Sequence, residues 1–206
     1  MQVKLYQAPK APNPDRVVFF LRAKGRLEDV DLEEISIMKQ EHRTDAYRAI
    51  SPMSQVPALV LDDGRTLTES RAICTYFEAL WPEPNLMGAD PYEKGEIEMW
   101  ERRIELMWML QFAVWFRNAH PMMAPLENPQ LPEAAEKAER NARAFVRRLD
   151  AHLSENDFVA AGRFTNADIT AFISCGFSGV MKWKPHEEHT ALGAWRERMK
   201  DMGFAG

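Results

Sequence analysis

Residues 51–70 read S-P-M-S-Q-V-P-A-L-V-L-D-D-G-R-T-L-T-E-S, and they carry the strongest structural signal in the chain. Pro57 directly precedes a short apolar run at residues 58–61, which is typical of a buried strand. Asp63-Gly64 is a strong signal for a two-residue β-hairpin turn, and a second short strand follows at residues 65–68. The segment therefore predicts a hairpin whose first strand begins directly after a proline.

The helix that follows this hairpin begins at Glu69-Ser70. This order places an acid, a hydroxyl and a helix N-terminus beside the strand that begins after Pro57. Such a corner can hold a small zwitterion, because free backbone N–H groups and the helix dipole attract a carboxylate while Glu69 attracts an ammonium. A simpler interpretation is a proline-capped hairpin followed by an N-capped helix, with no ligand. The presence of both halves in this order favours a ligand site.

Composition restricts the class of protein. The 206 residues are 46% hydrophobic and 28% charged, which suits one large globular domain or two small ones. The net charge of −5 argues against a nucleic-acid partner. We expect no secretory leader and no membrane-spanning segment, and the two distant cysteines predict a cytoplasmic location with reduced thiols. The five histidines lack metal-ligand spacing, so no metal is expected.

The first eighty or so residues alternate between strand and helix signals. They predict the order β-α-β-α-β-β-α, which is a thioredoxin-like pattern. The expected segments are a strand at 3–6, a loop at 8–14, a helix at 15–24 ended by Gly25, a strand at 30–35, an irregular or weakly helical stretch at 39–50, the hairpin, and a helix at 69–81.

The remainder of the chain is predicted to be helical. A breaker cluster at residues 82–85 marks the boundary, which gives a first domain at 1–81, a linker at 82–91 and an all-helical domain at 92–206. The expected segments are a helical run at 91–117, a connection at 121–132, a helix at 133–154, and a largely apolar helix that begins at a Thr165-to-Asp168 capping box and continues to about residue 180.

Several motifs together resemble one known family. They are Ala8-Pro9, Pro12-Asn13-Pro14, Glu41-His42-Arg43, Gln55-Val56-Pro57, Leu67-Thr68-Glu69-Ser70, Glu98-Met99-Trp100, and Phe116-Arg117 before His120-Pro121. Over essentially the whole chain, this pattern resembles the cytosolic glutathione transferases, in particular the fungal type-two group and its bacterial relatives. The resemblance implies an α/β thioredoxin-like N-terminal domain, an all-α C-terminal domain and glutathione as co-substrate.

The resemblance also implies roles for individual residues. Pro57 is expected to be cis, the backbone of Val56 to pair with the cysteinyl unit of glutathione, and the Glu69-Ser70 pair to hold the γ-glutamyl end. Gln55 belongs to the same implied glutathione site. His42 matches a position that contacts the glycyl carboxylate in several classes, although a surface histidine without a ligand is common.

Activation of the glutathione thiol needs a donor near the sulfur, since the unperturbed pKa of a thiol is about 8.5. The loop at residues 8–14 contains no serine, threonine or cysteine, and Ala11 stands where relatives often carry serine. This departure excludes a serine-type or mixed-disulfide cysteine-type site there. Asn13 is the best remaining donor, and its alternative role is to N-cap the following helix. Tyr6 is a rival donor, although it also fits a buried strand position.

The second domain offers another route to the thiolate. In the fungal group, second-domain residues position a water against the sulfur, and a histidine is usual where this chain has Asn118. His120 could substitute for that histidine, or it could cap the end of the long helix as a cation.

Aromatic residues on that helix offer a site for the second substrate. Trp108, Phe112 and Phe116 could wall an apolar pocket, or they could belong to the core or to a dimer interface.

The expected function is conjugation of glutathione thiolate to hydrophobic electrophiles in detoxification, by a homodimer. Peroxide or disulfide reduction is a further expected activity. The alternative is a non-catalytic or specialised member of the fold that binds a ligand or a protein.

Overall fold

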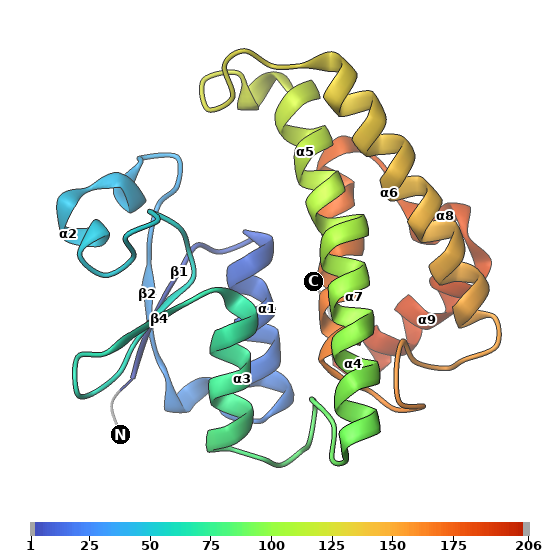
Figure 1. The fold of residues 1–206 in the computed structure, drawn as a ribbon, viewed down its shortest axis with the longest axis horizontal. Coiled ribbons are helices and arrows are strands. Elements are labelled where there is room, and N and C mark those ends of the chain that lie inside the picture. The colour runs from blue at the N-terminus through green and yellow to red at the C-terminus, as the bar shows by residue number, and fades with distance from the viewer. Residues whose placement is uncertain (1–2, 204–206) are drawn as a thin grey trace. The chain divides into compact units, whose positions relative to one another are not determined.

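The computed structural model describes residues 3–203. By its internal contacts the chain divides into two compact units, Met1–Leu86 and Met87–Gly206 (Figure 1). This division falls inside the segment expected to be the linker. The predicted domain limits at residues 1 and 206 lie outside the described residues.

The first unit has the predicted β-α-β-α-β-β-α order, which confirms the thioredoxin-like expectation. Its elements are β1 (Lys4–Gln7), α1 (Pro12–Ala23), β2 (Asp31–Glu34), α2 (Asp45–Arg48), β3 (Ala58–Val60), β4 (Thr66–Thr68) and α3 (Ser70–Leu80), with short 3₁₀ turns at Leu27–Asp29 and Glu41–Arg43. Within residues 3–203 these four strands form one sheet in the order β2-β1-β3-β4. β2 is parallel to β1, and the other neighbouring pairs are antiparallel.

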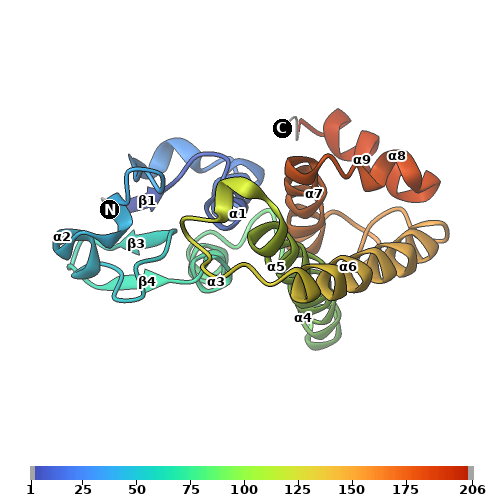
Figure 2. The same ribbon diagram turned by 90° about the horizontal axis from the view of Figure 1, so that it is seen from above.

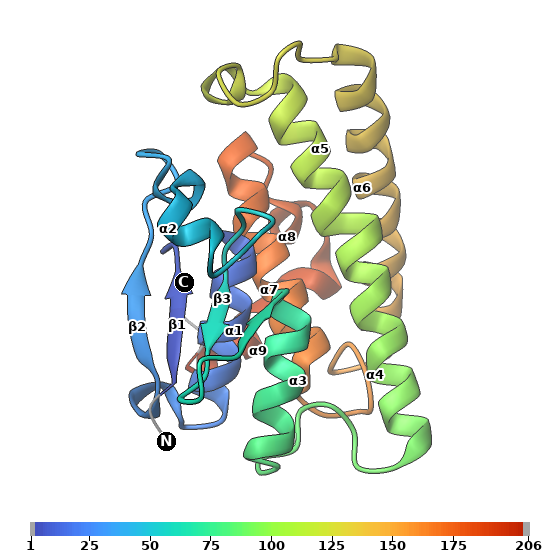
Figure 3. The ribbon, with the colours of Figure 1, turned by 60° about the vertical axis from the view of Figure 1, so that its left-hand side comes forward.

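Helices α1 and α3 lie side by side against one face of this sheet (Figures 1 and 3). The predicted apolar face of α1 is buried at Val17, Val18, Phe20 and Leu21. Ile73 and Phe77 of α3 are fully buried, and so are Leu5 and Leu59 of the sheet, each at 0% exposure. Burying such side chains contributes about 1.5–3 kcal/mol each, so this layer holds the unit together.

Helix α1 begins at Pro12, three residues earlier than predicted. The expected loop at residues 8–14 was therefore wrong in its second half. Proline is tolerated in the first turn of a helix, because the N–H that it lacks has no intrahelical partner there and its φ is already helical. The predicted stop is confirmed: Gly25 has φ +64°, and the Gly25 and Arg26 amides donate to the carbonyls of Arg22 and Leu21.

The β3–β4 turn is one residue longer than the predicted two-residue hairpin. The Leu61 amide donates to the Arg65 carbonyl at 2.9 Å, and the Gly64 amide donates to the Leu61 carbonyl at 3.0 Å. Gly64 has φ +83°. The loop is therefore a three-residue turn with glycine at the left-handed position, which is the next most common hairpin solution.

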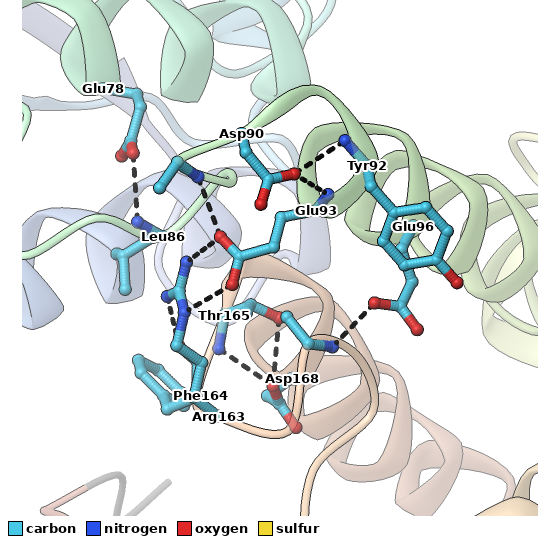
Figure 4. Close-up of polar contacts among 12 residues, drawn as sticks. Glu78, Leu86, Asp90, Tyr92, Glu93, Glu96, Arg163, Phe164, Thr165 and Asp168 are labelled. Atoms are coloured by element: carbon cyan, nitrogen blue, oxygen red, sulfur yellow. Dashed lines mark hydrogen bonds and ion pairs between the residues drawn. The ribbon is translucent and has the colours of Figure 1, made fainter.

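A buried lysine fastens the segment after α3 to the first unit. The Lys24 side chain is 0% exposed, and its ammonium lies 2.5 Å from Glu78 Oε2. It also donates to the Pro82 and Pro84 carbonyls, while Glu78 Oε1 accepts the Leu86 amide (Figure 4). A buried charge is costly unless it is paired and hydrogen-bonded, and this cage satisfies the ammonium.

The second unit is helical in its described residues. Its elements are α4 (Pro91–Ile104), a π-helical turn at Glu105–Met109, α5 (Leu110–Ala119), a 3₁₀ turn at Pro121–Met123, α6 (Pro132–Leu153), α7 (Asn166–Ser178), a 3₁₀ turn at Gly179–Met181, α8 (Pro185–Glu188) and α9 (Thr190–Asp201). Helices α5 and α6 run side by side (Figures 1 and 2). Among residues 3–203, no helix combines the length and the apolar character needed to cross a membrane.

The predicted capping box at the start of α7 is confirmed. Asp168 Oδ2 accepts the Thr165 amide at 2.9 Å (Figure 4). Asp168 Oδ1 accepts the Val159 amide and the Trp195 indole N–H, each at 2.9 Å. Burial raises the pKa of Asp168 to about 6, although these hydrogen bonds act in the opposite direction. The carboxylate therefore joins the α7 N-terminus, the preceding loop and α9, which is a structural role.

Candidate functional site

One open hollow in the first unit gathers most of the predicted glutathione residues. Its empty space, open solvent included, is about 280 Å³. Six of its lining residues were predicted from the sequence, namely Asn13, Gln55, Val56, Pro57, Glu69 and Ser70. Three others, Ser51, Met53 and Thr68, had no assigned role. Residues from the α1 N-terminus, the loop before β3 and the α3 N-terminus thus converge on a single depression.

The Val56-Pro57 peptide bond is cis, as predicted. Pro57 is buried and Val56 is half-buried, and β3 begins at the next residue. The backbone before the proline therefore forms one side of the hollow, while the strand after it enters the sheet.

The α3 N-terminus forms the opposite side. Ser70 is buried as the first residue of the helix, and Glu69 is exposed as its N-cap. Glu69 has φ +67°, an uncommon conformation for a residue other than glycine, and such residues cluster at ligand sites. The first-turn N–H groups of a helix lack intrahelical partners and attract an anion, while the Glu69 carboxylate attracts a cation.

Asn13 is exposed in the first turn of α1. The N-cap of α1 is Ala11, so the alternative that Asn13 N-caps this helix is wrong. The reason is the early start of α1, which places Asn13 inside the helix. The side chain therefore lines the hollow near a second helix N-terminus, where a developing negative charge is favoured.

Tyr6, the rival donor, lies elsewhere. It lines a separate surface depression with Lys4, Asp31 and Val60, and it is half-buried with its ring against Tyr47. Lys4 and Tyr6 alternate along β1 with the buried Leu5, so both side chains leave the face that α1 and α3 cover. This position does not favour Tyr6 as the thiol donor.

His42 is half-buried in the 3₁₀ turn before α2. Burial, assisted by the neighbouring Arg43 charge, lowers the pKa of His42 from its usual value. The imidazole is therefore neutral at pH 7, so it would meet a carboxylate as an N–H donor. His42 is not among the residues that line the hollow.

Asn118 and His120 have local hydrogen bonds in the second unit. Asn118 is buried, donates to the Val114 carbonyl at 3.0 Å and accepts the Leu131 amide at 2.8 Å. It thereby links α5 to the start of α6. His120 Nδ1 accepts the Met122 amide at 3.2 Å, so the side chain caps the 3₁₀ turn that follows α5.

The three aromatic candidates for the second substrate differ in exposure. Trp108 and Phe112 are 0% exposed. The Trp108 indole donates to Ser178, and Phe112 packs edge-on against Phe177. Both side chains therefore lie in the core of the helical unit, which was one of the alternatives. Phe116 is half-buried and retains exposed surface.

Sequence reasoning missed three lining residues, all of which lie within the segment 51–70. Ser51 and Met53 belong to the loop that leads to Pro57, and Thr68 directly precedes Glu69. Their place in this segment was the only sequence feature that could have indicated them. Sequence alone gave no indication of which way their side chains face, because this loop is irregular.

Comparison with known proteins identifies a family for both units. Residues 5–85 match the family model described as glutathione S-transferase, N-terminal domain, and residues 107–201 match that described as glutathione S-transferase, C-terminal domain. Glutathione S-transferase 2 of Saccharomyces cerevisiae is 35% identical over 197 residues, which cover 95% of this chain and 84% of that protein.

Solved structures agree with this result. Gtt2 from Saccharomyces cerevisiae superposes with a TM-score of 0.90 at 34% identity, covering 96% of this chain and 95% of that one. A glutathione S-transferase domain-containing protein from Marinobacter aquaeolei gives 0.88 at 35% identity, covering 95% and 96%. The fold, the two family models and these relatives together show that the chain belongs to the glutathione S-transferase family.

Proposed function

We propose that this glutathione transferase binds glutathione in the hollow of its first unit and transfers the thiolate to hydrophobic electrophiles. The observation that supports this site is the convergence of two helix N-termini, Glu69, Ser70 and the backbone before Pro57 on one depression. Glutathione carries an ammonium, two carboxylates and a thiol, and the hollow has complementary groups for the ammonium, the γ-glutamyl carboxylate and the thiol.

The groups of the hollow suggest the orientation of the ligand. The γ-glutamyl ammonium meets Glu69, and its carboxylate meets the Ser70 hydroxyl and the first-turn N–H groups of α3. The cysteinyl unit pairs with the backbone of Val56, which places the sulfur toward Asn13 and the N-terminus of α1. His42 as a neutral donor to the glycyl carboxylate is a further element of this proposal.

The chemical step is nucleophilic substitution or addition. The thiol loses its proton to solvent, and the thiolate is stabilised by the Asn13 amide N–H and the α1 dipole. The sulfur lone pair then forms a bond to the electrophilic carbon, and a leaving group departs or the adduct takes up a proton. Asn118 and His120 remain a proposed second source of stabilisation through a water, although their amide and ring nitrogen already serve local contacts.

Other aspects of the function follow from the same family. We place the electrophile against Phe116, which has exposed surface where Trp108 and Phe112 have none. We also propose a cytoplasmic detoxifying role, for which the free cysteines Cys74 and Cys175 give support, and a homodimeric assembly.

The decisive experiment removes the zwitterion contacts. Isothermal calorimetry should show that the double variant Glu69→Gln, Ser70→Ala loses measurable glutathione binding. A double variant of an exposed pair in the second unit, Ser154→Ala with Glu155→Gln, makes the same chemical changes and should bind normally. Unchanged affinity in the Glu69/Ser70 variant would refute this site. Tight glutathione binding by the wild type without conjugation of any electrophile tested would instead indicate a non-catalytic binding protein.

A further inference from the structure

Two hydroxyl groups converge on one backbone carbonyl beside the hollow. The Tyr47 hydroxyl and the Ser51 hydroxyl each donate to the Gln55 carbonyl at 2.9 Å. In addition, the Gln55 amide donates back to Ser51 Oγ at 3.3 Å. Gln55 is exposed and lines the hollow, whereas Tyr47 is 3% exposed and Ser51 0%. Buried donors therefore hold an exposed segment that has no sheet partner at this point.

Tyr47 is itself fixed from two sides. Its amide donates to Thr44 Oγ1, which caps α2, and its ring meets the Tyr6 ring edge-on with centroids 5.9 Å apart. Burial raises the pKa of Tyr47 to about 12, so its hydroxyl keeps its proton and remains a donor at any pH at which the protein works. Two neighbours also act on this pKa: the hydrogen bond with the Ser51 hydroxyl lowers it, and Tyr6 from β1 raises it.

We infer that Tyr47 and Ser51 are positioning residues for glutathione, acting through the Gln55 carbonyl. They fix the orientation of the peptide units at Gln55 and Val56, and so of the backbone groups that meet the cysteinyl unit. Tyr47 is not among the residues that line the hollow and so acts only through the carbonyl, whereas Ser51 both holds the carbonyl and lines the hollow. This inference rests on the proposed function of the hollow.

The physical basis is the cost of disorder in a binding loop. Ser54 lies at φ +55°, so the loop from Ser51 to Pro57 includes a conformation that residues other than glycine rarely adopt. A loop that must be ordered by its ligand binds more weakly than one already held in the bound conformation. Removal of one donor leaves the carbonyl with the other, whereas removal of both leaves it without the donors that now hold it.

The test uses Tyr47→Phe, Ser51→Ala and the double variant in the full chain. Each single variant should raise the dissociation constant for glutathione by about threefold to tenfold, and the double variant should raise it by more than the product of the two. The KM for glutathione should rise in parallel, while kcat and the KM for the electrophile stay unchanged. A purely structural role would instead lower kcat through loss of folded enzyme and leave both KM values unchanged.

Matched controls remove similar hydroxyls elsewhere. Ser154→Ala deletes a serine donor to the Ala151 carbonyl, and Tyr92→Phe deletes the hydroxyl of an exposed tyrosine. Both should bind glutathione as the wild type does. Amide hydrogen exchange of the unliganded protein provides a second readout, in which residues 54–56 should exchange faster in the Tyr47 and Ser51 variants than in the wild type or the controls.

The outcomes separate the two claims. If the wild type binds glutathione and the double variant binds it equally well, the positioning role is overturned and the proposed function stands. If the wild type does not bind glutathione, the proposed function fails and the inference fails with it. Unchanged exchange at residues 54–56 in the double variant would also overturn the inference, because the hydroxyls would then not hold the loop.

Discussion

Asn13 is the residue that we propose as the donor to the glutathione thiol. It is a neutral amide in the first turn of α1, exposed to the hollow, and the preceding loop offers no hydroxyl or thiol. A neutral hydrogen bond contributes about 0.5–1.5 kcal/mol net. Because 1.36 kcal/mol corresponds to one pKa unit, the amide can lower the thiol pKa by about one unit at most.

Asn13→Ala should therefore raise the pKa of enzyme-bound glutathione by up to about one unit, because it removes this donor. Conjugation below that pKa should slow by up to about tenfold, while the affinity for glutathione changes little. The ultraviolet absorbance of the thiolate, followed against pH, measures the first effect, and initial rates measure the second.

Asn118→Ala is the comparison for this prediction. It removes the hydrogen bond between Asn118 and Leu131 and should lower thermal stability, with a smaller effect on the thiol pKa than Asn13→Ala has. If Asn118→Ala or His120→Ala shifts the thiol pKa while Asn13→Ala does not, the proposed role of Asn13 is wrong and a water held by the second unit activates the sulfur.

Residue types and their order were enough to predict part of the hollow. Glu69, Ser70 and the Val56-Pro57 pair lie within one contiguous segment, so a short-range pattern could identify them. Tyr47 and its hydroxyl contact with Gln55 could not be read in this way. The contact depends on how α2 and the tyrosine ring pack in the folded unit. The sequence of residues 39–50 predicts only a weakly helical stretch and gives no information about that packing.

At the scale of elements, periodic apolar patterns predicted the type of most segments, and local chemistry decided where they begin and end. Helix α1 starts at Pro12 because two prolines can occupy its first turn. The predicted run at residues 91–117 contains a π-helical turn at Glu105–Met109. There the Gln111 side chain donates to the Leu106 carbonyl at 3.3 Å. A π turn inserts a residue without changing the helical composition, so periodicity does not reveal it.

The contribution of the α7 capping box to stability can be tested by substitution of Asp168. Asp168→Asn keeps the shape of the side chain, but it places an amide N–H₂ against two of the groups that now donate to the carboxylate. Leaving buried donors without an acceptor should destabilise the protein by about 2–4 kcal/mol. For a chain of this length each kcal/mol lowers Tm by about 2–4 °C, which calorimetry can measure. Asp157→Asn, at an exposed site, is the control and should change Tm little.

The pH dependence of this variant has a definite sign. Burial raises the folded-state pKa of Asp168 from 3.8 to about 6, so between these values the folded state binds a proton that the unfolded state releases. The stability contributed by this group is therefore fully present below 3.8 and is lost as the pH rises through 6. The stability difference between wild type and Asp168→Asn should be larger at pH 4 than at pH 7. A difference that grows with pH would contradict the raised pKa.

At the scale of the whole molecule, apolar side chains of the α4–α5 segment remain exposed. Met99, Leu106, Met107 and Leu110 are 40%, 48%, 40% and 49% exposed. Residues 99, 106 and 110 are separated by seven and four positions, so they follow one side of the helical segment. Trp108 and Phe112 of the same segment are buried in the core of the unit. The exposed methionine and leucine side chains are therefore not needed for that core and can contact another molecule. We assign it to the proposed interface with a second copy of the chain.

Static light scattering at micromolar concentration should give a mass of about twice 23.7 kDa for the wild type. The double variant Leu106→Glu, Leu110→Glu should be monomeric, because four charged carboxylates would face one another in a symmetric interface without partners. Met122→Glu with Leu131→Glu places the same charges on exposed apolar side chains elsewhere in the unit and should remain dimeric. A monomeric wild type would exclude the dimer. A dimer that persists in the Leu106/Leu110 variant would show that the chain assembles through another surface.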